Sequence, residues 1–165
     1  MEMRAEVTID VVPAAAWAVV GAEFGQIGQW CSAIRASFMD GPPAPGRTRT
    51  CQIAGFGPVA AGVIRERLVT YDADAMSLSY EATEGMPGFI RRAVSNWSVR
   101  PAGYGRCAVR IHATLTLTPL ARPLAPLLRW RLRADTRRVL EELRYRIQAG
   151  QPHPAKAAVM ARRAR

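Results

Sequence analysis

The segment PLLRWRLRADTRRVLEELRYRIQ, residues 126–148, decides the fold of this chain. Laid on a helix at about 100° per residue, its apolar side chains gather on one side, and the opposite side carries Trp130, Glu141 and several arginines. The apolar stripe consists of Leu124, Leu128, Leu132, Val139, Leu143 and Ile147. The segment allows about six turns at ~1.5 Å rise per residue, so it predicts a long helix that needs a partner surface.

Two polar residues interrupt this stripe halfway along. Asp135 and Thr136 either lie at the edge of the stripe, where they reach water or each other, or they face a cavity instead of a packed core. Farther along, Glu142 and Arg146 stand four positions apart with the acid first, an order that favours an ion pair on a helix. Gly150 then predicts the end of the helix.

The strictest alternation in the chain lies at residues 106–118, where every second side chain is apolar and the others are mostly threonine, arginine or histidine. This pattern predicts an antiparallel sheet with one face exposed to water. We expect further strands at 4–12, 33–39, 47–54, 62–71, 76–83 and 90–100, a helix from Pro13 and a short helix near 27–32. A strand, two helices, consecutive strands and a final helix define an α+β fold with about seven strands.

Length and composition favour a single domain. The chain has 165 residues, of which 49% are hydrophobic, enough for one core. We expect this domain at residues 1–150, followed at 151–165 by a basic, mobile C-terminal tail that contributes little to stability. No apolar run approaches the length of a membrane span. Three cysteines without metal-like spacing are typical of reduced thiols, so we expect a cytoplasmic protein without a metal or cofactor.

The net charge of +10 points to anionic partners. Nucleic acid, anionic lipid headgroups and acidic ligands are the classes that a basic surface attracts. The sequence contains neither an RNA-binding aromatic signature nor zinc-finger spacing, so we do not expect nucleic acid as a partner. Peripheral contact with an anionic membrane, through the basic helix face and the tail, remains as an alternative function. The sequence leaves the oligomeric state open.

Several short motifs occur in a characteristic order. Pro13 and Trp17 are followed by a second tryptophan at Trp30, and the later strands carry Glu66-Arg67-Leu68, Tyr71-Asp72 and Leu78-Ser79-Tyr80. In this order the motifs resemble the polyketide cyclase/dehydrase branch of the START-related (SRPBCC, helix-grip) superfamily, over residues 3–149. The resemblance implies an antiparallel sheet wrapped around the C-terminal helix, as in the birch-pollen-allergen fold, with an internal cavity. Family functions include ligand binding, lipid or quinone carriage and aromatic ring cyclisation.

Residues 47–68 also look like the plant abscisic acid receptors in layout. In those receptors a lysine on the second strand and a glutamate on the fourth line the pocket, and the matching positions here are Arg35 and Glu66. The receptors' gate loop corresponds to residues 55–58, where Phe56 and Gly57 depart from the gate sequence. The resemblance therefore does not imply a hormone receptor.

Alternation supports a pocket on independent grounds. Glu66 shares a strand face with Ile64 and Leu68, where a carboxylate is costly unless it is paired or protonated. It therefore either meets Arg35 or another arginine, as a structural ion pair, or binds a polar ligand group. Tyr80 and Trp97 serve either as core aromatics or as ligand contacts. The candidate ligand-binding residues are Arg35, Ile53, Glu66, Tyr80, Ser95, Trp97, Leu132, Asp135 and Thr136.

The sequence contains no evident nucleophile–base pair, metal cluster or phosphate loop. If the chain is an enzyme, Glu66 and Tyr80 are the candidate catalytic residues. We expect a carrier or binding protein for a hydrophobic small molecule such as a lipid, quinone, polyketide or aromatic compound. A polyketide cyclase or aromatase acting in the same cavity is the first alternative, and an interaction module using the basic face is the second.

Overall fold

The computed structural model describes residues 1–54 and 60–163. Seven antiparallel strands form one sheet in the order β1-β7-β6-β5-β4-β3-β2. The strands are β1 (Glu2–Ile9), β2 (Ile34–Met39), β3 (Thr48–Ile53), β4 (Gly62–Asp72), β5 (Ser77–Glu84), β6 (Ile90–Pro101) and β7 (Cys107–Leu117). The helical elements are α1 (Pro13–Trp17), the π-helix η1 (Ala18–Ala22), the 3-10 helices η2 (Phe24–Gln29) and η3 (Pro119–Leu124), α2 (Ala125–Ala149) and α3 (Pro154–Arg163). The predicted α+β class and seven-stranded sheet are confirmed.

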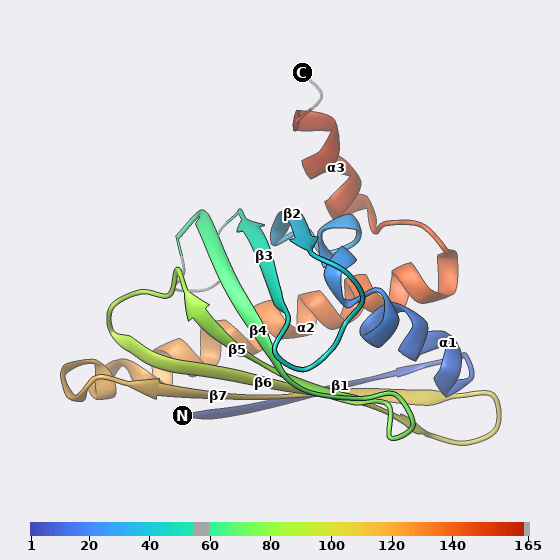
Figure 1. The fold of residues 1–165 in the computed structure, drawn as a ribbon, viewed down its shortest axis with the longest axis horizontal. Coiled ribbons are helices and arrows are strands. Elements are labelled where there is room, and N and C mark those ends of the chain that lie inside the picture. The colour runs from blue at the N-terminus through green and yellow to red at the C-terminus, as the bar shows by residue number, and fades with distance from the viewer. Residues whose placement is uncertain (55–59, 164–165) are drawn as a thin grey trace.

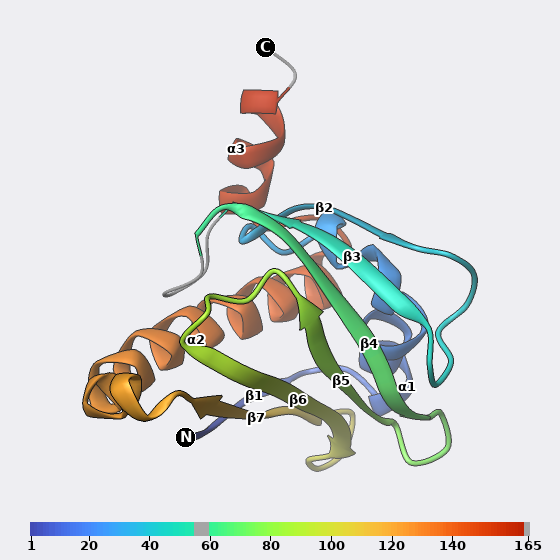
Figure 2. The same ribbon diagram turned by 60° about the vertical axis from the view of Figure 1, so that its left-hand side comes forward.

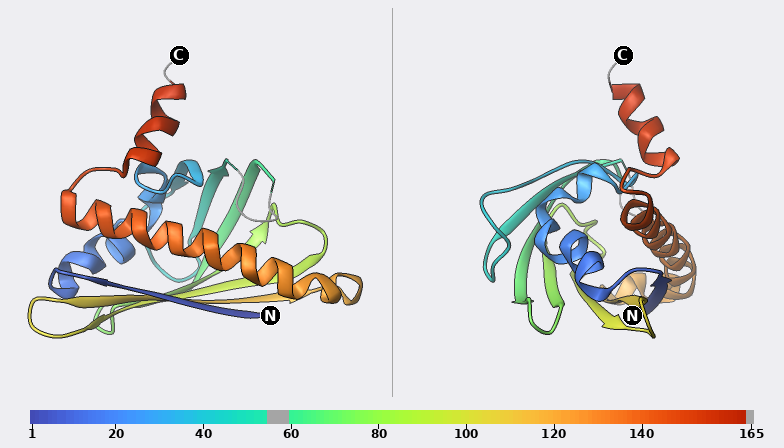
Figure 3. Two further views of the ribbon diagram at one scale, coloured as in Figure 1. Left: turned by 180° about the vertical axis from the view of Figure 1, so that it is seen from behind. Right: turned by 90° about the vertical axis from the view of Figure 1, so that its right-hand side faces the viewer.

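The sheet curves strongly, and α2 closes its open side (Figures 1 and 3). Leu143 is fully buried, and Val139 and Leu140 pack in the same cluster as Val109 and Ile111 of β7. Toward the start of the helix, Leu132 packs with Leu115, Ile90 and Met3 in a second cluster. The predicted apolar stripe is thus confirmed from Leu128 onward, whereas Leu124 ends η3 and is exposed.

The helix expected from Pro13 consists of two short elements, α1 and the π-helix η1. Within η1, the amide of Glu23 donates to the carbonyl of Ala18, a π-type bond of 2.9 Å. The chain then tightens into η2, which corresponds to the expected short helix but begins and ends three residues earlier, at Phe24 and Gln29. At Gly28 a Cβ would lie 2.6 Å from the backbone nitrogen of Ser37, so only glycine lets η2 pack this closely on β2.

Part of the predicted C-terminal tail is helical. Residues 154–163 form α3, which stands away from the sheet while its base lies near β2 (Figure 2). Lys156 is fully buried at that base, and its Nζ donates to the carbonyl oxygen of Ile34 at 2.6 Å. The ammonium group therefore fixes the first turn of α3 to the start of β2. Among the helices of the described residues, none has the length and apolar character that crossing a bilayer requires.

Candidate functional site

An internal cavity of about 200 Å³ lies between the sheet and α2. Strands β3 to β7 supply most of its wall, and α2, η2, β1, the start of β2 and two connecting segments supply the rest. Apolar side chains dominate the wall, which contains Met3, Ile27, Ala33, Ile34, Ile53, Ile64, Ala82, Met86, Ile90, Ala93, Val94, Trp97, Ile111, Ala113, Leu115, Leu132 and Val139. The polar or sulfur-bearing side chains in the wall are Cys31, Arg49, Glu66, Tyr80, Ser95 and Thr136.

Most of the predicted site residues come together in this wall: Ile53, Glu66, Tyr80, Ser95, Trp97, Leu132 and Thr136. Thr136 is the polar interruption of the helix stripe that faces the cavity, and its hydroxyl contacts Met3 Sδ at 3.6 Å. The loop at 84–88 contributes Met86 to the wall. Residues 55–58, which match the receptors' gate loop in position, lie outside the described residues.

Arg35 and Asp135 are not part of the cavity wall. Arg35 is exposed and lines a separate surface hollow beside η2 and α3. The reason is a register shift between Ile34 and Ala36 in the β2–β3 pairing, because a bulge there breaks the alternation that would turn Arg35 inward. Asp135 lies at the edge of the stripe and forms an ion pair with Arg131 at 3.2 Å, one helical turn away.

The arginine that meets Glu66 is Arg49, directly opposite it in the β3–β4 register. Arg49 Nε and a terminal nitrogen donate to Glu66 Oε2 at 2.9 and 2.6 Å, and the remaining nitrogen donates to the carbonyl of Phe24 at 2.7 Å. The guanidinium also stacks 3.7 Å from the centre of the Phe24 ring. Sequence reasoning missed Arg49, although it has the same strand parity as Ile53, which the sequence does assign to the cavity.

Electrostatically, Arg49 and Glu66 form one neutral unit. Only 2% of the Arg49 side chain and 16% of the Glu66 side chain are exposed. Burial alone would lower the pKa of Arg49, but the adjacent carboxylate of Glu66 raises it, so the guanidinium stays charged. Because every nitrogen of this guanidinium already donates to the protein, the cavity offers an incoming anion little excess positive charge.

The two oxygens of Glu66 differ in their surroundings. Oε2 accepts both bonds from Arg49 and also contacts the thiol of Cys51 at 3.6 Å. Oε1 accepts no hydrogen bond from any residue that the structure describes. Since Glu66 lines the cavity, Oε1 is an acceptor that a molecule inside the cavity can use.

A hydroxyl cluster lies beside this carboxylate. Tyr80 and Ser95 are directly opposite each other in the β5–β6 register, and Trp97 Nε1 donates to Ser95 Oγ at 3.2 Å. Burial and the nearby charge of Glu66 raise the pKa of Tyr80 to about 12, while Arg49 and the polar groups of Ser95 and Trp97 act in the other direction. Tyr80 is therefore a neutral phenol at neutral pH and can donate a hydrogen bond to a ligand.

The thiols near the cavity are unsuited to nucleophilic chemistry. Burial raises the pKa of Cys31 to about 12, with Glu142 contributing in the same direction. Burial likewise raises the pKa of Cys51 to about 12, although Arg49 opposes it. Both are protonated at neutral pH, and the thiolate is the reactive form. Within residues 1–54 and 60–163, no cluster of His, Cys, Asp or Glu could hold a metal ion.

A second buried carboxylate, Glu142, belongs to the packing of the domain. Its two oxygens accept bonds from the backbone amide and the hydroxyl of Ser32 and from Arg138 Nε. The expected partner, Arg146, instead donates to the carbonyl of Gly150 at the end of α2. Glu142 thus attaches the segment after η2 to α2, and it does not line the cavity.

A curved antiparallel sheet wrapped around a long C-terminal helix, with a cavity between them, defines the helix-grip fold of START-related proteins. The sequence matches the family model described as polyketide cyclase / dehydrase and lipid transport over residues 1–148. The chain therefore belongs to this family. No curated protein matched the sequence.

Solved structures share the fold. A protein from Thermus thermophilus superposes with a TM-score of 0.71 at 18% identity, covering 91% of this chain and 99% of the other. A START superfamily protein from Mycobacterium smegmatis has a TM-score of 0.71 at 12% identity, with coverage of 91% and 99%. A protein from Thermobifida fusca is 26% identical, with a TM-score of 0.65 and coverage of 92% and 97%. The family and these likenesses agree on the helix-grip fold, and they name no ligand for this chain.

Proposed function

We propose that this protein binds a small, mostly apolar molecule carrying one hydrogen-bond donor, and that it acts as a binding or carrier protein for that molecule. The observation that carries the proposal is a cavity with apolar walls in which Glu66 Oε1 is an acceptor without a hydrogen bond from the described residues. An apolar pocket with a few placed polar groups is the usual form of a small-molecule site.

Cavity size limits the class of ligand. An apolar protein cavity of about 150 Å³ accepts benzene, and drug-sized ligands occupy sites of about 300–1,000 Å³. At about 200 Å³ the cavity suits one or two aromatic rings or a short acyl chain. A complete lipid or a quinone with its tail would need the cavity to widen or would leave the tail outside.

The polar end of the cavity favours a donor over an anion. Arg49 is neutralised by Glu66, so a carboxylate or phosphate entering there would lose water without gaining a free cation. A hydroxyl or amine can instead donate to Glu66 Oε1. The neutral phenol of Tyr80 and the hydroxyl of Ser95 are close enough in the sheet to bond the same group. A phenol, an alcohol or an enol therefore fits this end.

Calorimetric titration with 2-naphthol and naphthalene tests the proposal, because the two probes differ only in the hydroxyl group. We expect both to bind the wild type, with 2-naphthol tighter. Glu66→Gln should weaken 2-naphthol about tenfold, since a bond to a charged acceptor exceeds a neutral one by roughly 1–1.5 kcal/mol, and should change naphthalene by less than about twofold. Leu132→Trp should fill the cavity and abolish binding of both.

Glu142→Gln is the matched control, because it neutralises the other buried glutamate, which lies outside the cavity wall. This variant should bind both probes as the wild type does, whatever its stability. Absence of binding by the folded wild type would refute the proposal. Equal weakening by Glu142→Gln and Glu66→Gln would refute the role given to Oε1.

One observation favours a second candidate, a cyclase acting in the same cavity. Glu66 and Tyr80 present a carboxylate and a neutral phenol to one wall. The carboxylate could remove a proton from a carbon beside a ketone while Tyr80 bonds the ketone oxygen, and the resulting enolate carbon would attack a second carbonyl carbon, whose oxygen takes up the proton. A rate of ring closure on a poly-β-ketone that is lost in Glu66→Gln but kept in Glu142→Gln would establish this activity.

A further inference from the structure

One surface of the molecule exposes large apolar side chains in a row. Leu120, Leu124, Leu127 and Trp130 have exposed fractions of 94%, 54%, 62% and 67%. Single exposed apolar residues are normal, but four within the eleven residues 120–130 form a contiguous feature of η3 and the start of α2. We call these four side chains, together with the four arginines described in the next paragraph, the docking surface.

The docking surface is also strongly positive. Its arginines are Arg122, Arg129, Arg133 and Arg137, and none of them forms an ion pair within the described part of the chain. In contrast, Arg131 and Arg138 on the same helix are paired with acids. The sequence contains no Asp or Glu between residues 113 and 134. Apolar groups and uncompensated positive charge therefore coincide.

The helix register places Leu127, Trp130, Arg133 and Arg137 on the side of α2 that faces away from the sheet, whereas Arg129 lies on a flank of the helix and Leu120, Arg122 and Leu124 belong to η3. Leu127 and Trp130 are three positions apart, so they are neighbours on the helix surface. Arg133 and Arg137 stand three and seven positions after Trp130, so their side chains lie on the same side of the helix as Trp130. The sheet is contacted by the opposite stripe of Leu132, Val139 and Leu143, so nothing in the described part of the fold covers the docking surface.

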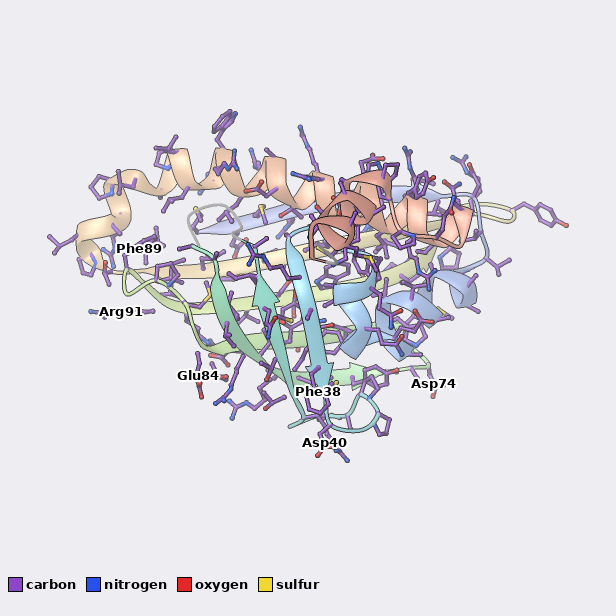
Figure 4. All side chains as sticks on the ribbon, turned by 90° about the horizontal axis from the view of Figure 1, so that it is seen from above. Phe38, Asp40, Asp74, Glu84, Phe89 and Arg91 are labelled. Carbon is purple, nitrogen blue, oxygen red and sulfur yellow. The ribbon has the colours of Figure 1, made fainter. Side chains whose placement is uncertain are left out.

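This surface adjoins one end of the cavity. Ala121 and Leu128 pack in the same cluster as Leu115 and Leu132, which line the cavity. The amide of Thr118, just before η3, donates to the carbonyl of Phe89 at 2.9 Å. Figure 4 shows Phe89 and Arg91 at the same end of the molecule as the start of α2. A partner bound here would therefore lie next to the cavity.

We propose that η3 and the first half of α2 dock this protein on anionic membrane surfaces. Leucine and tryptophan enter the boundary between headgroups and acyl chains, and arginines bind the anionic headgroups. The surface is the convex outer side of a helix, which a deformable lipid interface accommodates without a preformed pocket. A second copy of this chain would bring four uncompensated arginines against four others, so charge opposes that occupant.

Vesicle sedimentation tests the proposal. The wild type should sediment with phosphatidylcholine vesicles containing about 30% phosphatidylserine, far less with phosphatidylcholine alone, and less at about 0.5 M than at about 0.1 M salt. Because Trp17, Trp30 and Trp97 are buried, a blue shift of tryptophan emission on binding should arise from Trp130 and vanish in Trp130→Phe.

Paired variants make the test specific. Arg133→Gln with Arg137→Gln should weaken binding about 25-fold, at about fivefold for each arginine. The matched control is Arg67→Gln with Arg100→Gln, which removes the same charge from exposed positions on β4 and β6. The control pair should weaken binding less than about threefold if the docking surface carries the interaction. Leu127→Ser should also weaken binding, with an unchanged melting temperature, because Leu127 is exposed.

Three results would overturn the proposal: no binding of the wild type to phosphatidylserine vesicles, equal losses in the two arginine pairs, or a stable dimer that Leu127→Ser dissociates. The last result would assign the surface to a second copy of the chain. Leu132→Trp should retain vesicle binding while losing the naphthol probes, so failure of the docking proposal and failure of the cavity proposal are distinguishable.

Discussion

Replacing Arg49 with methionine should reveal whether the ion pair with Glu66 is a coupled unit. The substitution keeps an unbranched side chain but removes two bonds to Glu66 and one to the carbonyl of Phe24. Loss of one member of a buried pair costs about 3–5 kcal/mol, because it leaves the other charge buried and unpaired. At roughly 2–4 °C per kcal/mol for a chain of this size, the melting temperature should fall by about 6–20 °C.

A more specific prediction is that Glu66→Gln changes stability in opposite directions in the wild type and in the Arg49→Met variant. In the wild type, Glu66→Gln should destabilise, because it leaves Arg49 without its counter-charge. In the Arg49→Met background, the same Glu66→Gln should stabilise, because it removes the unpaired buried carboxylate. Urea unfolding of the wild type, both single variants and the double variant forms a double-mutant cycle that gives the coupling energy directly.

An exposed pair provides the comparison. Arg65 and Glu84 also face each other across neighbouring strands, but their side chains are largely exposed. Arg65→Met should therefore cost less than about 1 kcal/mol. If the Arg49 and Glu66 effects add within about 0.5 kcal/mol, or if Glu66→Gln has the same sign in both backgrounds, then Arg49 and Glu66 do not act as a unit and our electrostatic description of the cavity is wrong.

Three further predictions concern stability. Burial raises the pKa of Cys31 and Cys51 to about 12 from an ordinary value of 9.0, so above pH 9 the unfolded chain loses these protons first. The contribution of the two buried thiols to the free energy of unfolding should therefore be complete below about pH 8.5, and it should fall at higher pH by up to ~1.4 kcal/mol per pH unit for each thiol. In urea unfolding measured across this pH range, Cys51→Ala should make the decline shallower. An unchanged slope in this variant would contradict the prediction. Leu143→Ala should cost about 2–5 kcal/mol in urea unfolding, and a loss below half a kcal/mol would mean that the burial of α2 is misassigned. Deleting residues 151–165 should lower the free energy of unfolding by about 1.5 kcal/mol or more, because it removes the hydrogen bond from Lys156 to the carbonyl of Ile34. Lys156→Met should reproduce most of that loss. An unchanged melting temperature would instead mean that the tail contributes nothing to stability.

Alternation predicts the inner face of the sheet where strands are regular, and it fails where they are not. The positions of Ile53, Tyr80 and Trp97 follow from a period of two, and the structure places all three in the cavity wall. The likeness to a receptor assigns Arg35 to the pocket, but a bulge in β2 turns it outward. A single-residue bulge leaves almost no trace in the sequence, because it depends on how the partner strand is paired.

Arg49 and Glu142 show a different limit. Each is a charged residue that the fold buries: Arg49 has the inward parity of its strand, and Glu142 lies beside the apolar stripe of α2. Sequence reasoning treats each as exposed or paired locally, because charged side chains rarely enter a core. The partner of Arg49 is Glu66 on the neighbouring strand, and Glu142 is bonded to Ser32, 110 residues away, as well as to Arg138 on its own helix. Lys156 is similar, since its acceptors lie on β2. Hydrophobic periodicity predicts which face of an element is buried, but it does not predict which distant polar groups form pairs.

The two buried glutamates together indicate where the site is. Both lie inside the domain and both are paired with arginine. Glu142 accepts bonds at both oxygens, so its hydrogen-bonding capacity is met by the fold, as expected of a structural group. Glu66 has bonds from described residues at one oxygen only, and it borders a cavity. Oε1 of Glu66 is therefore open to water or to a ligand, and this contrast between the two carboxylates is what assigns Glu66 to the site and Glu142 to the packing of the domain.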